Sequence, residues 1–235
     1  MIGKYMNSVA LNIDCMEYMR SCKYKEFDLA VVDPPYYTDP KNIIIPGGHL
    51  STTGVRRTKY HMPRWSIPDA EYFHELQRIS KAQIIWGVNY FPIASAMGTG
   101  RIVWDKRSDN GTKFSDCEIA YCSLEKTVRI VRYMWNGMIV QEPLNKEARI
   151  HPTQKPIALY RWIFKKYTKI GNRVFDSHLG SGSSRIAAQL LGLDFVGVEI
   201  DKNYFEAQES RYAGFLHDEL AQQNIDLGDA DYGTI

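Results

Sequence analysis

The sequence FDLAVV, residues 27–32, runs directly into Asp33-Pro34-Pro35-Tyr36. The mainly apolar run is short and ends in β-branched residues, which predicts a buried parallel strand. The strand must end at Pro34, because proline has no backbone N–H to donate to a neighbouring strand. In an open α/β sheet, ligands bind outside the carboxyl ends of the strands. The tetrapeptide is therefore expected at a binding site.

The tetrapeptide carries groups suited to holding a planar base by its exocyclic amine. The carboxylate of Asp33 and the carbonyl of Pro34 can each accept one N–H, which would draw the nitrogen lone pair out of conjugation and make the amine nucleophilic. The ring of Tyr36 can stack on the base. A Pro-Pro turn with a capping aspartate is the alternative interpretation, and the tetrapeptide alone does not decide between the two.

Length and composition predict one globular domain over 1–235. The chain has 235 residues, of which 44% are hydrophobic and 24% are charged, as is usual for a water-soluble globular protein. No stretch is apolar enough to cross a membrane, and the first residues lack the apolar core of a signal peptide. A cytoplasmic protein without membrane partners is expected.

Positive charge is clustered, although the formal net charge is only +2. Proline and glycine interrupt any periodicity in 37–65, which predicts a lid or DNA-contacting loop. Its basic residues alternate with aromatic ones and favour phosphate contact, although a solvated loop is the alternative. The loop after residue 105 is a second basic turn. The candidate nucleic-acid contacts are Arg56, Arg57, Lys59, Arg64, Lys106 and Arg107.

The four cysteines, Cys15, Cys22, Cys117 and Cys122, lack the C-x-x-C spacing of a zinc site. They are expected to be free thiols. The sequence therefore predicts no metal.

Strand-like and helix-like segments alternate along much of the chain. Ser66-x-x-Asp69 resembles a capping box that opens a helix, and 224–235 is expected to be a loose tail. Strands are expected at 9–13, 27–32, 82–86, 101–105, 118–122, 128–133, 173–176 and 195–199. Helices are expected at 15–20, from 67 to 79 with Pro68 in the first turn, and at 157–167, 185–191 and 204–212.

A second group of candidate ligand-binding residues begins with the strand that ends at Asp176. Gly180 and Gly182 in the following turn allow close approach of a ligand, and the next strand ends in Glu199, which can accept both hydroxyls of a ribose. Arg185 stands where a dinucleotide-binding motif has its third glycine, which disfavours NAD. A Gly-x-Gly turn can also be merely tight. An adenosine ligand with a carboxylate and an amine fits better.

Taken together, these motifs resemble the S-adenosylmethionine-dependent DNA amino-methyltransferases of the permuted beta class. The motifs follow the order of that family across nearly the whole chain: Asp14, then Asp33-Pro34-Pro35-Tyr36, then His151-Pro152-Thr153-Gln154-Lys155-Pro156, then 176–183, then Glu199. The resemblance implies a Rossmann-like α/β methyltransferase fold. Its sheet would be central, mainly parallel and seven-stranded, with helices on both faces and a circularly permuted motif order.

The resemblance also implies roles for individual residues. Asp14 would contact the cofactor adenine, although an aspartate that caps the next helix would look identical. Ser177-His178 replaces the Pro-Phe usual in the family, so His178 is either a polar cofactor contact or a substituted packing residue. The implied catalytic residues are Asp33, Pro34, Pro35 and Tyr36; the implied cofactor-binding residues are Asp14, Thr153, Gln154, Lys155, Asp176, His178, Gly180, Ser181, Gly182, Ser183 and Glu199.

The activity implied is methyl transfer from S-adenosylmethionine to adenine N6 in double-stranded DNA, with the base flipped out of the duplex. An aspartate at position 33 favours adenine, because serine is common there in cytosine N4 enzymes of the family. No large recognition domain is visible, so either 37–65, 106–113 and 135–150 or a partner protein is expected to recognise DNA. A homodimer is a further expectation. The alternatives are a non-catalytic DNA-binding subunit, a cytosine N4 enzyme, and a methyltransferase acting on RNA or a protein amide.

Overall fold

The computed structural model describes residues 7–37, 60, 63–107, 115–136, 139–140 and 147–230. Its main feature is an eight-stranded sheet with the strand order β1-β10-β9-β2-β3-β5-β4-β6. The strands are β1 (Ser8–Leu11), β2 (Phe27–Val32), β3 (Ser80–Trp86), β4 (Arg101–Asp105), β5 (Cys117–Cys122), β6 (Val128–Arg132), β9 (Arg173–Asp176) and β10 (Asp194–Val198). The short strands β7 (Trp135–Asn136) and β8 (Ile139–Val140) pair with each other within the expected recognition segment.

The sheet is mainly parallel, as expected. Only β5 runs against its neighbours, β3 and β4, and all the other pairs are parallel. The expected number of seven strands was one too low, because all eight apolar segments of the sequence join this sheet. Since β5 is antiparallel, its first residues lie at the edge where β3 and β4 end. That edge also receives the carboxyl end of β2.

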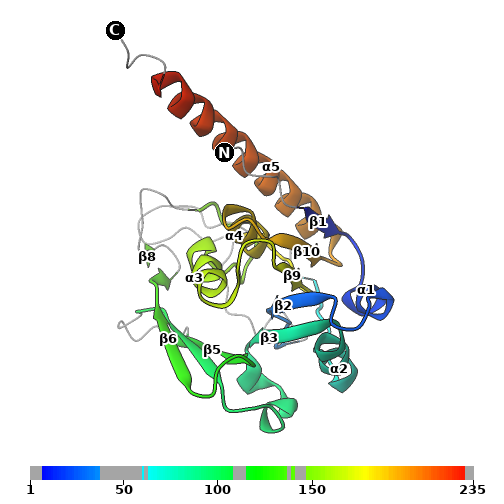
Figure 1. Ribbon diagram of the computed structural model, residues 1–235. Helices are drawn as coiled ribbons and strands as arrows, with labels where there is room; N and C mark the ends of the chain where they lie inside the picture. The colour runs from blue at the N-terminus through cyan, green and yellow to red at the C-terminus, as the bar shows by residue number, and fades with distance from the viewer. Residues whose placement is uncertain are drawn as a thin grey trace.

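Helices cover both faces of the sheet (Figure 1). On one face α3 (Ile157–Tyr167) and α4 (Ser183–Leu190) pack on side chains such as Leu29 of β2. On the other face α1 (Cys15–Ser21) and α2 (Ala70–Ile79) pack on side chains such as Ala30. Consecutive residues of a strand point to opposite faces, so β2 is buried on both sides. The α/β fold class and the helices on both faces are confirmed.

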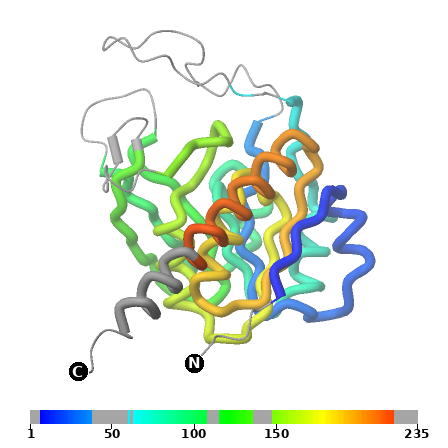
Figure 2. The backbone as a smooth tube through the Cα atoms, turned by 90° about the horizontal axis from the view of Figure 1, so that it is seen from above, coloured from blue at the N-terminus to red at the C-terminus, as the bar shows by residue number. Residues whose placement is uncertain are grey.

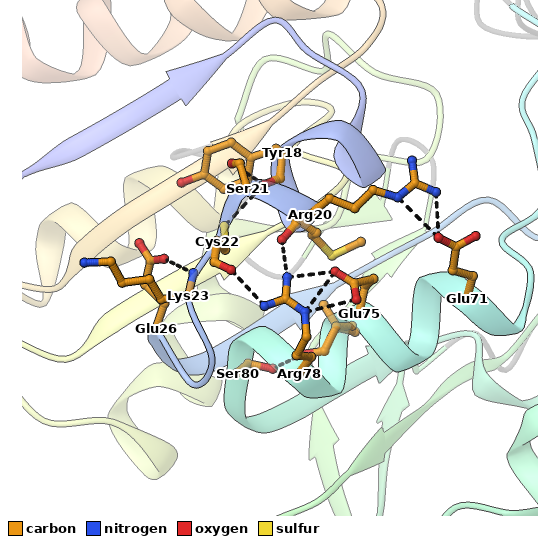
Figure 3. Close-up of polar contacts among 12 residues, drawn as sticks. Tyr18, Arg20, Ser21, Cys22, Lys23, Glu26, Glu71, Glu75, Arg78 and Ser80 are labelled. Carbon is orange, nitrogen blue, oxygen red and sulfur yellow. Dashed lines mark hydrogen bonds and ion pairs between the residues drawn. The ribbon is translucent and has the colours of Figure 1, made fainter.

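A network of polar contacts joins α1 to α2 (Figure 3). The guanidinium of Arg78 donates to the carbonyl of Cys22 at 2.8 Å and to that of Met19 at 2.6 Å, and it pairs with Glu75 at 2.8 Å. The last carbonyls of a helix have no partner within the helix, so Arg78 satisfies the end of α1 from α2. These contacts fix the carboxyl-terminal end of α1 against α2.

The start of α2 differs from the expected capping box at Ser66. Asp69 is the N-cap, and its side chain accepts from the backbone N of Tyr72 at 3.1 Å. The residue before a proline is disfavoured in helical conformation. Because Ile67 precedes Pro68, the helix begins only at Ala70.

The last helix, α5 (Lys202–Ala230), is much longer than the expected 204–212. It extends away from the rest of the protein (Figure 1), and Figure 2 shows its first half beside β1 and β10. The expected loose tail, 224–235, overlaps this helix up to Ala230. Alanine, leucine and glutamine are strong helix formers and recur after residue 212. No helix in the described part of the chain has the length and apolarity needed to cross a membrane.

Candidate active site

Four carboxylates follow four neighbouring parallel strands at one edge of the sheet. Asp14, Glu199, Asp176 and Asp33 come at or shortly after the ends of β1, β10, β9 and β2, which are adjacent in that order. The register pairs Ala30 of β2 with Phe175 of β9. The tetrapeptide and the glycine turn, separated by about 140 residues in sequence, therefore begin side by side.

The side chains of the tetrapeptide contact one another and the segment that follows β3. The hydroxyl of Tyr36 donates to Oδ1 of Asp33. The ring of Tyr36 stacks on that of Tyr90, with centroids 4.8 Å apart and an interplanar angle of 12°. It also packs edge-to-face with Phe91, with centroids 6.0 Å apart. An aromatic wall thus stands beside the carboxylate of Asp33.

Gly87, just after β3, makes room for the Tyr36 ring. A Cβ atom at this position would lie 1.9 Å from Cε1 of Tyr36, and the backbone has a φ of +66°. Both the space and the left-handed conformation require glycine here. Gly87 is therefore part of the candidate site, although nothing in the sequence motif pointed to it.

The glycine turn orients Glu199. Gly180 donates its backbone N–H to Oε2 of Glu199 at 2.8 Å, and Asp201 donates to Oε1 at 2.9 Å. Each carboxylate oxygen has a second lone pair, so both oxygens keep an acceptor site for a ligand hydroxyl. Gly182, with a φ of +73°, is the N-cap of α4.

The two serines of the turn face protein groups. Ser181 and Ser183 are buried, their hydroxyls lie 3.1 Å apart, and Arg211 of α5 donates to the Ser181 carbonyl at 2.7 Å and to the Ser183 hydroxyl at 3.0 Å. Arg211 also pairs with Glu147 at 2.7 Å. These serines therefore fix the backbone of the turn, and the backbone is what remains to meet a ligand.

Asp176 is buried, with 2% of its surface exposed. Its carboxylate accepts from the hydroxyl of Ser184 at 2.6 Å and from the backbone N of His178 at 3.1 Å. Burial raises the pKa of Asp176 to about 7 in spite of these bonds, and the charges of Asp33 and Glu199 add to the rise. No cation of the described residues forms an ion pair with Asp176. This edge of the sheet is therefore suited to a positively charged ligand with hydroxyl groups.

The segment that begins at His151 covers the glycine turn. A Cβ atom on Gly180 would lie 3.7 Å from the His151 ring, which itself lies 4.2 Å from the ring of Tyr204. Burial lowers the pKa of His151 to about 3, so the ring is neutral. The hydroxyl of Thr153 lies 3.2 Å from Nδ1 of His151. Thr153 and His151 thus lie next to the expected cofactor site.

Gln154 and Lys155 were expected to contact the cofactor, but their side chains bind protein groups. Gln154 accepts from the backbone N of Ile150 at 3.0 Å and donates to the carbonyl of Ala148 at 3.1 Å, so it holds its own segment in shape. The ammonium of Lys155 instead binds Oδ2 of Asp33. A buried ammonium requires an anionic partner, and Asp33 supplies one.

The expected nucleic-acid contacts are only partly described. Lys106 forms an ion pair with Glu118 at 2.6 Å, and its side chain is only 16% exposed. A nearby carboxylate thus already partners its charge, and its role as a phosphate contact stays a prediction. Arg64 and Arg107 are exposed. Arg56, Arg57 and Lys59, like most of the expected lid at 37–65, lie outside the described residues.

The two residues that depart from the family pattern belong to a polar chain. The hydroxyl of Ser177 lies 2.7 Å from that of Tyr72 and 2.8 Å from Nδ1 of His178. The ring of His178 also packs edge-on against Tyr72, and burial lowers its pKa to about 4. This geometry favours a packing role for His178. Asp14 caps α1, accepting from the backbone N of Met16 at 2.9 Å and of Glu17 at 3.1 Å, as in the alternative interpretation.

Several residues of this site were missed by the sequence analysis. Ser184 directly follows the glycine turn, and Tyr90 comes shortly after the end of a predicted strand. Their positions in the sequence could therefore have indicated both residues. Nothing in the sequence indicated Glu118 or Arg211, because each reaches the site only through the arrangement of β5 and α5 in space. All four cysteines are free. Among the residues described, no three His, Cys, Asp or Glu side chains cluster as metal ligands.

Comparison with known proteins adds independent information. The family model of N6/N4 methyltransferases, described as a DNA methylase, matches residues 103–210. The Type II methyltransferase M.HinfI of Haemophilus influenzae is 22% identical, over 89% of this chain and 69% of its own length. The Type II methyltransferase M2.DpnII of Streptococcus pneumoniae is also 22% identical, over 86% of this chain and 88% of its own.

The chain resembles the DNA N6/N4 amino-methyltransferases. Solved structures show the same fold. The M1.HpyAVI–SAM complex superposes with a TM-score of 0.54 at 20% identity, over 86% of this chain and 98% of its own. The cytosine-N4-specific PvuII DNA methyltransferase superposes with a TM-score of 0.58 at 12% identity, over 89% of this chain and 87% of its own. The resemblance predicted from the motifs is thereby confirmed.

Proposed function

We propose that this protein transfers a methyl group from S-adenosylmethionine to the exocyclic amine of a base in DNA, with adenine N6 as the preferred acceptor. The observation that carries the proposal is the meeting of the tetrapeptide with a carboxylate-lined edge, where Asp33 and Asp176 follow adjacent parallel strands. The similarity to Type II methyltransferases supports DNA as the substrate class.

The residues present suit this cofactor. Glu199 would accept the ribose hydroxyls, since its two oxygens are oriented by backbone amides and each keeps an acceptor site. Asp176 would face the positive charge, because its buried carboxylate has no cationic partner among the described residues and gains from one. When bound, S-adenosylmethionine supplies a methyl group on a sulfonium, which needs no metal for its transfer.

The side chains of the tetrapeptide would prepare the acceptor. Asp33 Oδ1 and Oδ2 each accept one bond from the protein and each keep a second lone pair. Asp33 and the Pro34 carbonyl can therefore accept the two N–H groups of the amine, which aims its lone pair at the methyl group. Alignment of two bound reactants is worth about 7–11 kcal/mol, so no covalent enzyme intermediate is needed. After transfer the amine would lose one proton to water, through its contact with the carboxylate of Asp33.

The base must leave the duplex to reach Asp33, because its amine is otherwise paired. Unpairing and unstacking cost roughly a few kcal/mol. The rings of Tyr36, Tyr37 and Tyr90, which lie within 6.5 Å of one another by centroid distance, offer an aromatic surface that offsets part of this cost. Aspartate at the first position of the tetrapeptide supports adenine over cytosine.

The test is methyl transfer to DNA. The protein is incubated with cofactor carrying a labelled methyl group and unmethylated double-stranded DNA, and the DNA is digested to nucleosides. Label in N6-methyl-2′-deoxyadenosine is expected, whereas label in N4-methyl-2′-deoxycytidine would overturn the choice of base and keep the reaction class. Asp33→Ala should abolish transfer while cofactor binding, measured by calorimetry, persists. A wild-type protein that binds the cofactor and labels no DNA would refute the proposed function.

A further inference from the structure

Lys155 and Arg185 are the buried cations in the part of the chain that the structure describes. The side chain of Lys155 is 4% exposed, and its ammonium lies between Oδ2 of Asp33 and Oε2 of Glu118, the latter at 3.0 Å. The ring of Trp86, at the end of β3, lies beneath it with a centroid 5.5 Å from Nζ. Lys155 therefore touches the carboxylate that is proposed to hold the reacting amine.

Glu118 fixes the far side of this ammonium. Its Oε2 faces Lys155, and its Oε1 pairs with Lys106 at 2.6 Å. Burial would raise the pKa of Glu118, but Lys155 and Lys106 lower it to about 2, so the carboxylate is ionised at neutral pH. The result is a row of alternating charges from Asp33 through Lys155 and Glu118 to Lys106.

The row crosses the sheet at the edge of the candidate site. Asp33 follows β2, Glu118 is the second residue of β5, and Lys106 follows β4, in the sheet order β2-β3-β5-β4. Lys155 alone comes from the segment that covers the glycine turn. Because β5 runs antiparallel, its beginning can meet the ends of its neighbours. The antiparallel direction of β5 thus places the carboxylate of Glu118 next to Lys155.

We propose that Lys155 is a positioning residue that holds the carboxylate of Asp33 in its working orientation, and that Glu118 in turn holds Lys155. The inference rests on the proposed function and assigns to Lys155 a role different from cofactor binding. Asp33 receives one donor on each oxygen, from Tyr36 and from Lys155, and these two contacts fix both the torsion and the plane of the carboxylate.

The charges make this arrangement self-consistent. Burial alone would lower the pKa of Lys155, but Asp33 and Glu118 outweigh it and raise the pKa, so the side chain stays protonated. Loss of either carboxylate would leave a buried charge without full compensation. Loss of the ammonium would leave two carboxylates facing each other across the space that it filled. Asp33 is then expected to turn toward water.

Kinetics of four variants test the proposal. Lys155→Met removes the charge and keeps much of the volume, Lys155→Arg keeps the charge, and Glu118→Gln weakens the second contact. Lys81→Met is the matched control, because Lys81 also pairs with an aspartate, Asp28, at 2.7 Å, but is 60% exposed on the surface. Turnover, the KM values and the cofactor Kd are measured for each variant with unmethylated DNA.

For Lys155→Met, turnover should fall about a hundredfold, as a misplaced reactive group typically causes, with the cofactor Kd within about threefold of the wild type. The turnover of Lys155→Arg should be about tenfold higher than that of Lys155→Met. The turnover of Glu118→Gln should be about tenfold lower than that of the wild type. Lys81→Met should match the wild type. A Lys155→Met protein with normal turnover and a much weaker cofactor Kd would overturn the inference, since Lys155 would then belong to the cofactor site.

A second measurement is independent of activity. Crystal structures of the wild type and of Lys155→Met, without substrate, should differ in the side-chain torsion of Asp33, with its contact to Tyr36 lost in the variant. An unchanged Asp33 in the variant would refute the positioning role. A wild-type protein inactive on DNA would refute the proposed function alone, because the comparison of Asp33 in the two crystals does not depend on turnover.

Discussion

Asp176→Asn is expected to make the protein more stable at pH 8 and unable to bind its cofactor tightly. The carboxylate of Asp176 is buried, and its pKa is raised from the ordinary 3.8 to about 7, chiefly by burial. The folded protein thus holds this proton more tightly than the unfolded chain does. The contribution of Asp176 to the free energy of unfolding is therefore fully present below about pH 4. It is lost as the pH rises through 7.

The magnitude follows from the two pKa values. A rise from 3.8 to about 7 corresponds to about 4 kcal/mol of destabilisation above pH 7, at about 1.4 kcal/mol per tenfold change in affinity for the proton. Asparagine has the same shape without the charge, and its oxygen can still accept from Ser184. The lost second acceptor costs about 1 kcal/mol. A net gain of about 3 kcal/mol is expected at pH 8, and near equality at pH 5.

Urea denaturation at pH 5 and pH 8, followed by circular dichroism, measures this difference. Asp28→Asn is the control of opposite sign, because the partners Lys81, Arg173 and Asn172 lower the pKa of Asp28 although burial opposes them. That variant should lose stability at pH 8. If Asp176→Asn were destabilised equally at both pH values, the carboxylate would not be strained by burial and the argument for a cationic ligand at this position would fail.

Three further predictions concern single features. Gly87→Ala should displace Tyr36, since the added Cβ would lie 1.9 Å from its ring. The rate of methyl transfer should fall at least about tenfold, while the cofactor Kd measured by calorimetry stays unchanged. Full activity of the variant would contradict this packing. Asp69→Ala should lower stability by about 1 kcal/mol, measured by thermal unfolding, because α2 loses its N-cap contact to Tyr72. Cofactor affinity should increase from pH 6 to pH 8, with proton release detected by calorimetry in two buffers, because a cation binds the ionised form of Asp176; a pH-independent Kd would count against it.

The sequence predicted the elements that depend on local pattern. The strand ending at Asp33 and the glycine turn after Asp176 each combine an apolar run with proline or glycine, and local chemistry alone determines where such runs end. The parallel pairing of β2 and β9 follows from the fold class. For the same reason, the edge at which ligands bind was predictable.

The features that the sequence analysis missed depend mainly on how distant segments are arranged in space. Glu118 lies near Asp33 because β5 inserts antiparallel between β3 and β4, which no local pattern in residues 117–122 reveals. Lys155 was assigned by its place in a motif, and the motif does not say which way a long flexible side chain turns. The length of α5 was underestimated because its polar composition suggested a tail, whereas intrinsic helix propensity favoured continuation.

The adjacency of β2 and β9 also bears on how the protein is made. A nascent chain that stops anywhere between residues 37 and 150 contains the tetrapeptide but neither the ammonium that contacts Asp33 nor the turn that orients Glu199. The two halves of the site thus reside on opposite halves of the polypeptide. Incomplete translation products are therefore expected to lack a complete site until synthesis has reached the carboxyl-terminal third.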